Sequence, residues 1–304
     1  MYIISKRIIK SKGEENMEEK INVYDWCRNV ISEISEVFLR DGQPYVVADL
    51  PQVNEIFLLF AKQTQLFESF LLLMQHNHTE EGIILFRSMI NNSMLIQYLS
   101  TFDPDESEYR VKNFKAQSFK VNVKRLNNYK FALEKGWFEQ VASIDNPMTV
   151  SDIEGRIEKI KESLIEAGLT TKQGKADTQP LTIRSLAEVD VTLFSIYIQY
   201  YDIASRYEHS DVTSLDIYKE KIDDETPTNM AYIMNLSRTD EILNQEILYM
   251  CVSFYGLSYL RILEFLSSNE DIDLNSWWTM EQQSRLTKLS LEFDFFVQNN
   301  QEII

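Results

Sequence analysis

The segment around residue 205 collects side chains that could transfer a proton and stabilise an anion. If one helix continues through it, Tyr201, Ser205 and His209 lie on one face at a spacing of four. Arg206 lies three positions before His209 and is therefore also adjacent to it. Histidine titrates near neutral pH and arginine can stabilise a negative intermediate, so this set could cleave a phosphodiester without a metal. The structural alternative is a histidine interacting with the helix dipole among packed tyrosines.

A second candidate is Arg87, which lies in the otherwise apolar stretch ILFRSMINNSMLI, four positions before Asn91. A buried guanidinium without partners costs several kcal/mol, so something polar must meet that face of the helix. The partner is either structural, such as a carboxylate or a helix end, or a ligand. If folding brings the two regions together, the candidate catalytic residues are His209, Arg206, Arg87 and Tyr201.

The third candidate is the segment 109–131, which holds seven basic residues and no acidic one in a chain with a net charge of −17. Drawn as one helix, it has an apolar side that includes Phe119 and Val123, opposite a basic face. The residues of that face are Arg110, Lys120, Lys124 and Arg125. The face either pairs with acidic groups of the protein or a partner subunit, or binds phosphate or RNA. In both cases we expect charge reversal of Lys120, Lys124 and Arg125 to leave the fold intact.

Metal and cofactor chemistry receive little support from the sequence. A di-iron bundle requires Glu-x-x-His pairs, and none of the three histidines has a glutamate three positions earlier. Cys27 and Cys251 are too few for a disulfide framework or a cysteine-rich zinc site, and two lone thiols suit a reducing compartment. Glycine-rich phosphate loops are also missing from the sequence. We therefore expect neither a cofactor nor a metal.

The charge and the apolar runs predict a cytoplasmic protein. A net charge of −17 repels nucleic acids and anionic membranes at long range. The most apolar run, residues 247–260, is shorter than the roughly 20 residues of a membrane span, which predicts a core helix. Residues 1–16 are basic at their start but form no secretory apolar region. They are either a flexible N-terminal extension or the product of a start codon upstream of Met17.

The elements that must position these residues are helices. Only eight glycines and six prolines occur, and several helix caps precede apolar stripes, which predicts an all-α fold. We expect an antiparallel bundle of about seven to eight long helices in a single domain, residues 17–304. Residues 169–181 are expected to form a surface loop or a linker. The expected helices cover residues 17–40, 50–75, 80–100, 104–135, 151–168, 182–208, 238–268 and 277–298.

Three stretches together resemble a known family of bacterial helical proteins. They are LFRSM at residues 85–89, YLSTFDP at 98–104 and YDIASRYEHS at 201–210. They are similar to an Arg-Ser helix, a Tyr-Leu helix end before Asp-Pro, and a Tyr-x-x-x-Ser-x-Tyr-x-His segment of the family of unknown function 5677. The resemblance covers about residues 50–270. This chain has Asn91 where the family tends to have glutamate, so an Arg–Glu pair with Arg87 cannot form.

The resemblance also implies a helical layout similar to the HEPN group of bacterial defence and toxin proteins. Ribonucleases of that group use an arginine and a histidine separated by four to six residues. Arg206 and His209 are separated by two, so an enzyme of that kind needs another arginine, such as Arg87, supplied by folding. This step is an analogy between folds and does not itself establish an activity.

Three functions are therefore open at the level of sequence. The first is a cytoplasmic, non-catalytic, homo-oligomeric interaction module, in the setting of phage defence or a toxin-type system. The second is a metal-independent, HEPN-like ribonuclease that uses His209 with Arg87 or Arg206. The third is a sensor that binds a small ligand under Arg87 and His209. The expected partners are a second copy of the chain, another protein, or RNA at the basic face, and no membrane.

Overall fold

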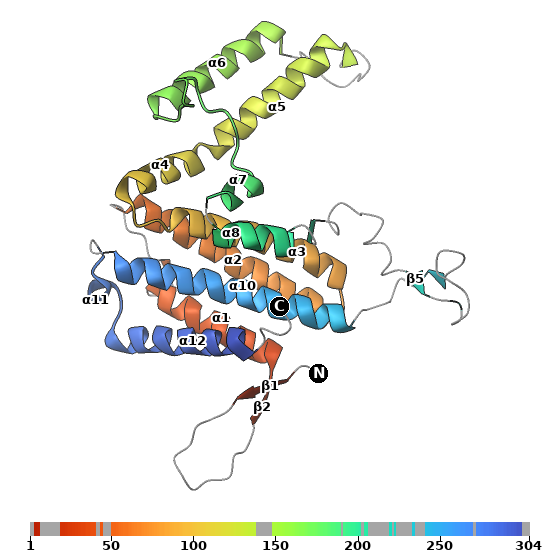
Figure 1. Ribbon diagram of the computed structural model, residues 1–304, viewed down its shortest axis with the longest axis vertical. Helices are drawn as coiled ribbons and strands as arrows, with labels where there is room; N and C mark the ends of the chain where they lie inside the picture. Colours follow the sequence, from red (N-terminus) through yellow and green to blue (C-terminus); the bar gives the residue numbers. More distant parts are fainter. Residues whose placement is uncertain are drawn as a thin grey trace. The chain divides into compact units, whose positions relative to one another are not determined.

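The described part of the chain is helical and forms two compact units. A computed structural model describes residues 3–6, 19–40, 43–44, 50–137, 148–189, 191–201, 204–205, 219–220, 222, 233–234, 241–269 and 272–299. The larger unit combines Met1–Ser100 with Ala187–Ile304, and the smaller unit is Thr101–Leu186. The all-α prediction is confirmed (Figure 1). The single domain expected over residues 17–304 is organised as these two units.

The larger unit is built around one long helix. Helix α10 (Glu241–Ser268) contacts α2 (Pro51–Gln75) and α3 (Thr79–Leu99), and also packs against α12 (Met280–Asn299). Figure 1 shows α2, α3 and α10 side by side, with α1 (Val23–Phe38) and α12 next to them. The bounds of α2, α3 and α10 agree with the sequence within a few residues. The short helix α11 (Leu274–Trp277) precedes α12.

Helix α10 is buried over most of its circumference, as its apolar sequence predicts. Phe60 and Phe67 of α2 both stack on Tyr255, with ring centroids 5.5 and 4.6 Å away. Gly256 faces Phe293 of α12 so closely that an added Cβ would lie 2.5 Å from a ring carbon of the phenylalanine. The glycine is therefore needed for the close approach of α10 and α12.

The described strands are short and form three separate antiparallel pairs. They are β1 (Ile3–Lys6) with β2 (Glu19–Asn22), β3 (Leu39–Arg40) with β4 (Gln43–Pro44), and β5 (Lys219–Glu220) with β6 (Ile233–Met234). The first pair contains residues 3–6 of the expected N-terminal extension, and the rest of residues 1–16 lies outside the described residues. The first helix begins at Val23, after β2, and not at residue 17 as expected. The Asn22 side chain accepts a hydrogen bond from the Tyr24 amide, 2.9 Å away, at the start of this helix.

The smaller unit contains α4 (Pro104–Lys115), α5 (Gln117–Glu134), α6 (Val150–Glu166) and the first residues of α7 (Ile183–Ala187). The expectation of a single helix over residues 104–135 is wrong, because the helix is interrupted at Ala116, between α4 and α5. This alanine is buried against Leu164 and Leu169, contacts that the local sequence does not reveal. Helix α6 begins at Val150, one residue before the expected start at residue 151, and Thr149 and Asp152 form a capping box there. Hydrogen bonds from Thr149 lower the pKa of Asp152.

The expected helix over residues 182–208 is also wrong. It is replaced by α7, by α8 (Val191–Ile196) and by a π-helical turn, η2 (Tyr197–Tyr201). Val189 lies between α7 and α8, and its β-branched side chain has a lower helix propensity than an unbranched one. Beyond Tyr201, residues 204–205 are the next that the structure describes.

Lys120 is completely buried, which contradicts its predicted place on a solvent-exposed basic face. Its ammonium group donates hydrogen bonds to Asp177 Oδ2 at 2.5 Å and to Asn113 Oδ1 at 2.8 Å. Lys120 lies three positions before the buried Val123 and shares its side of α5, where the distant Asp177 compensates its charge. Lys120 therefore points into the unit. Phe119, expected on the buried apolar side of this helix, is 53% exposed. Charge reversal at Lys120 cannot leave this fold intact.

The first prediction concerns this ion pair. Replacing Asp177 with alanine should lower the free energy of unfolding by about 3 kcal/mol, because it leaves a buried ammonium group uncompensated. Lys120→Met, which also removes the charge, should be better tolerated. The matched control is the exposed Lys124→Met, for which we expect a change of less than about 0.5 kcal/mol. Urea unfolding followed by circular dichroism measures all three, and equal values for Asp177→Ala and Lys124→Met would contradict the role of the pair.

Candidate functional site

Two of the four candidate catalytic residues meet in the larger unit. Arg87 Nη2 on α3 donates a hydrogen bond of 2.6 Å to the hydroxyl oxygen of Tyr201, 114 residues later in the chain. The guanidinium carbon also lies 4.9 Å from the centroid of the tyrosine ring, a cation–π contact. Hydrogen bonds with a charged donor are short and strong, so this pair fixes the end of η2 on α3. Arg206 and His209 lie outside the described residues.

The π turn presents its tyrosines in two directions. Tyr200 packs edge-on against Phe254 of α10, at a centroid distance of 5.5 Å, and Phe254 packs in the same way on Phe86 of α3. Tyr197 instead stacks on Tyr201, at 5.6 Å and with 23° between the ring planes. Burial raises the pKa of Tyr200. Tyr200 thus anchors the turn to the core, and Tyr201 binds Arg87. Single π turns are frequent at functional sites.

The neighbouring polar residues of α3 take different roles. Asn91, expected to share a face with Arg87, is exposed. Asn92 is buried and its amide nitrogen donates to Leu59 O at 2.6 Å and to Gln63 Oε1 at 3.1 Å. Gln63 in turn contacts Ser258 of α10, so a buried polar network links α2, α3 and α10. The sequence analysis expected a polar group in contact with Arg87, and the hydroxyl of Tyr201 is such a group.

An exposed apolar stripe lies directly before Tyr201, and the sequence analysis missed it. Val191, Phe194 and Ile198 are 83%, 41% and 59% exposed. Their spacing of three and four residues places them along one side of α8 and η2. Residues 191–201 contain no charged side chain, a signal that was available in the sequence. We call Val191, Phe194 and Ile198 the apolar stripe.

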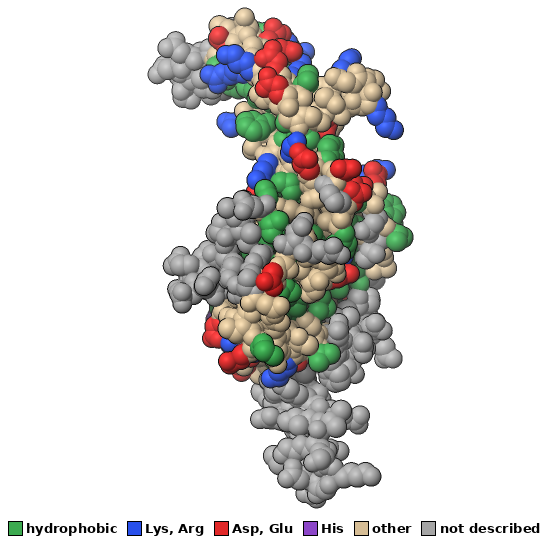
Figure 2. Space-filling model, turned by 90° about the vertical axis from the view of Figure 1, so that its left-hand side faces the viewer, with side chains coloured by type: hydrophobic (Ala, Val, Ile, Leu, Met, Phe, Trp, Pro, Cys, Tyr) green, Lys and Arg blue, Asp and Glu red, His purple; other side chains and the backbone are tan. Residues whose placement is uncertain are grey.

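The predicted basic face is not assembled as a unit. Arg110 is half-buried and pairs with Glu106, and Lys120 is buried against Asp177. Lys124 and Arg125 remain exposed, and no ion pair of either is formed within the described residues. On the side of the molecule drawn in Figure 2, acidic and basic side chains are interspersed over the described surface.

Within the described residues, no group of three or more histidine, cysteine or acidic side chains could hold a metal ion. Both cysteines, Cys27 and Cys251, are buried, and burial raises the pKa of both thiols.

Two segments, α2 and Asn244–Ser268, have the length and composition of membrane spans. The segment of α10 is 67% buried inside the protein, as core helices with the same composition also are.

The second prediction concerns the coupling between Arg87 and Tyr201. A double-mutant cycle with Arg87→Met and Tyr201→Phe should give a coupling energy of about 1.5–3 kcal/mol, because the hydrogen bond has a charged donor. Tyr201→Phe keeps the ring and therefore isolates the hydroxyl group. Tyr197→Phe is the matched control on the same turn and should couple weakly to Arg87. A coupling near zero for Tyr201, measured by urea unfolding, would show that the pair does not hold the turn.

A comparison with families gives one match, and its range includes both members of this pair. The profile of a family described as "Family of unknown function (DUF5677)" matches residues 55–226, more than half of the chain. Searches of the curated proteins and of the solved structures found no significant match. The matched range contains the three stretches that carry the resemblance, including the segment that follows Tyr201. The chain belongs to the family of unknown function DUF5677.

Proposed function

We propose that the protein is a non-catalytic, homo-oligomeric interaction module that associates with itself through the apolar stripe. The observation that carries this proposal is the exposure of Val191, Phe194 and Ile198 along one side of α8 and η2. A chain with a net charge of −17 repels its own copies. Two copies therefore associate best where acidic groups are absent, and residues 191–201 have none.

Burial of the stripe in a symmetric contact offsets much of the cost of association. Full burial of a valine, isoleucine or phenylalanine side chain contributes about 1.5–3 kcal/mol. In a twofold dimer the same surface is used on both copies, so each contact residue counts twice. The sum is comparable with the cost of association, about 4–15 kcal/mol. Polar contacts around the stripe then decide the affinity.

The setting of this module is part of the proposal. Two buried cysteines without a disulfide are in keeping with the cytoplasm. The resemblance of the family's helical layout to the HEPN group supports a bacterial defence or toxin-type system, in which a helical module also binds another protein. Neither α2 nor α10 is assigned to a membrane in this proposal.

The third prediction tests self-association. Sedimentation equilibrium of the wild-type chain should show a dimer, and Ile198→Asp should raise its dissociation constant by about 100-fold or more, equivalent to about 3 kcal/mol. The reason is that the substitution brings two carboxylates together at the contact. The dissociation constant of the wild type should fall as salt is added, because salt screens the repulsion between two chains of net charge −17.

Leu72→Asp is the matched control, since Leu72 is an exposed apolar residue of α2, away from α8 in sequence and on another helix. It should leave the dimer unchanged. A wild-type chain that stays monomeric throughout the micromolar range would refute self-association. Equal dissociation by Ile198→Asp and Leu72→Asp would refute the assignment to the apolar stripe.

One observation favours the second candidate function, a metal-independent ribonuclease. The hydrogen bond between Arg87 and Tyr201 brings together two of the four residues selected for this chemistry. In this mechanism His209 transfers the proton, Arg87 stabilises the anionic intermediate, and Tyr201 positions the guanidinium group. Arg206 is the alternative arginine.

The fourth prediction separates the two functions. If the protein cleaves RNA, His209→Ala should lower the rate by about 10²–10⁴-fold, the usual contribution of a general acid or base. The melting temperature should barely change. His78→Ala is the control, because His78 is exposed at the start of α3 and should not affect cleavage. Cleavage that is absent in the wild type, or unchanged by His209→Ala, would leave the non-catalytic module as the function.

A further inference from the structure

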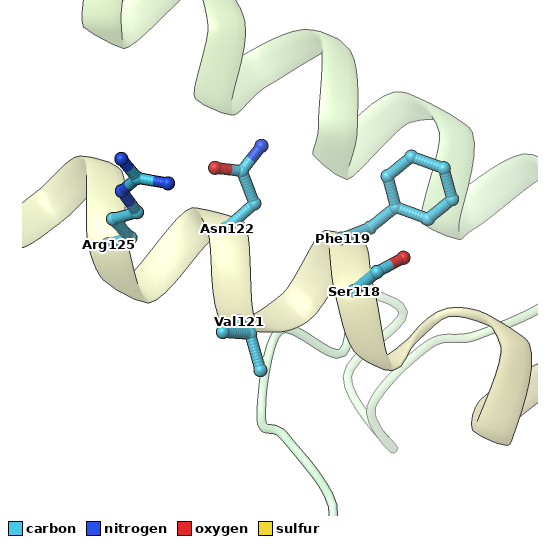
Figure 3. A pocket seen from close by; sticks show the side chains of 5 residues that line it. All are labelled: Ser118, Phe119, Val121, Asn122 and Arg125. Carbon is cyan, nitrogen blue, oxygen red and sulfur yellow. The ribbon is translucent and has the colours of Figure 1, made fainter.

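A shallow depression lies on the exposed side of α5, in the smaller unit. Its lining comes from one helix and consists of Ser118, Phe119, Val121, Asn122 and Arg125. Figure 3 shows the side chains of Phe119, Asn122 and Arg125 following one another on one side of the helix. Successive members are three residues apart, which is about 4.5 Å along the axis at 1.5 Å per residue. An aromatic ring, an amide and a guanidinium group are thus aligned within about 9 Å.

These groups are available to a ligand. Phe119 is 53% exposed, although its ring is large enough to favour burial. Within the described part of the chain, the Asn122 amide makes no hydrogen bond and Arg125 makes no ion pair. Both side chains are exposed and are therefore solvated when no ligand is bound.

The stretch of α5 that lines the depression carries a charge opposite in sign to that of the whole chain. Residues 117–133 contain no aspartate or glutamate, in a protein with a net charge of −17. Lys124 lies next to Arg125 and is also exposed. The third basic residue of this region, Lys120, is buried against Asp177 and holds α5 in place from the opposite side. The exposed side of α5 therefore presents two adjacent cations, Lys124 and Arg125, that attract an anion.

We propose that this surface binds single-stranded nucleic acid. Phe119 stacks on a base, Arg125 and Lys124 contact the phosphates, and Asn122 and Ser118 form hydrogen bonds to the backbone or to a base edge. The exposed phenylalanine decides between ligands, since an acidic peptide uses the cations but has no need of a stacking ring. Duplexes are disfavoured because their bases are already stacked. The proposal does not depend on self-association of the larger unit.

The fifth prediction tests this site by fluorescence anisotropy with the full chain. The probes are labelled oligouridylate and oligothymidylate of about twelve nucleotides, within the usual site size. Phe119→Ala should weaken binding by about 5- to 150-fold, equivalent to the loss of one stacked base. Arg125→Gln should weaken binding and reduce the slope of log affinity against log salt by about 0.7, as expected for one phosphate contact to a single strand.

Two controls remove an aromatic ring and a positive charge elsewhere in the smaller unit. Phe131→Ala removes an exposed phenylalanine from the far end of α5, and Lys159→Gln removes an exposed charge from α6. Both should bind like the wild type, and melting curves check that each variant is folded. The proposal is overturned if the wild type binds neither probe at low salt, or if polyglutamate competes as well as the oligonucleotides. It is also overturned if Arg125→Gln weakens binding while Phe119→Ala does not, since this would show a surface for anions in general.

Discussion

The larger unit depends on the burial of α10. A helix of 28 residues that is apolar around most of its circumference cannot leave one side in water, so other helices must surround it. Helices α2 and α3 cover it on one side and α12 on another. The absence of a side chain at Gly256 lets Phe293 approach α10 closely, and the buried contact between Gln63 and Ser258 fixes α2 against it.

The candidate site is connected to this core. Tyr200 packs on Phe254 of α10, and this contact sets the position of the π turn that carries Tyr201. Arg87 then holds the turn from α3. The apolar stripe begins on α8, the short helix that leads into the π turn, and ends three residues before Tyr201. A change in the packing of α10 should therefore affect both the Arg87–Tyr201 pair and the surface proposed for self-association.

The sequence predicts those features that depend on near neighbours. Helices α2, α3 and α10 have long apolar periodicities, and the need of Arg87 for a polar partner follows from the residues around it. Other features depend on contacts over long separations. Ala116, at the break between α4 and α5, packs on Leu164 and Leu169, and the burial of Lys120 depends on Asp177, 57 residues away. The apolar stripe was missed because residues 182–208 were treated as one packed helix, although their long uncharged run was visible.

The order of the elements along the chain has a consequence for biosynthesis. The smaller unit interrupts the larger one, so α10 begins at Glu241, roughly 140 residues after α3 ends at Leu99. At about 5–20 residues per second, a ribosome needs roughly 7–28 seconds to make that stretch. During this time the apolar sides of α2 and α3 that later cover α10 have no partner from their own chain. The nascent chain thus passes through a stage at which a chaperone that binds apolar surfaces has a defined target, the α2–α3 hairpin.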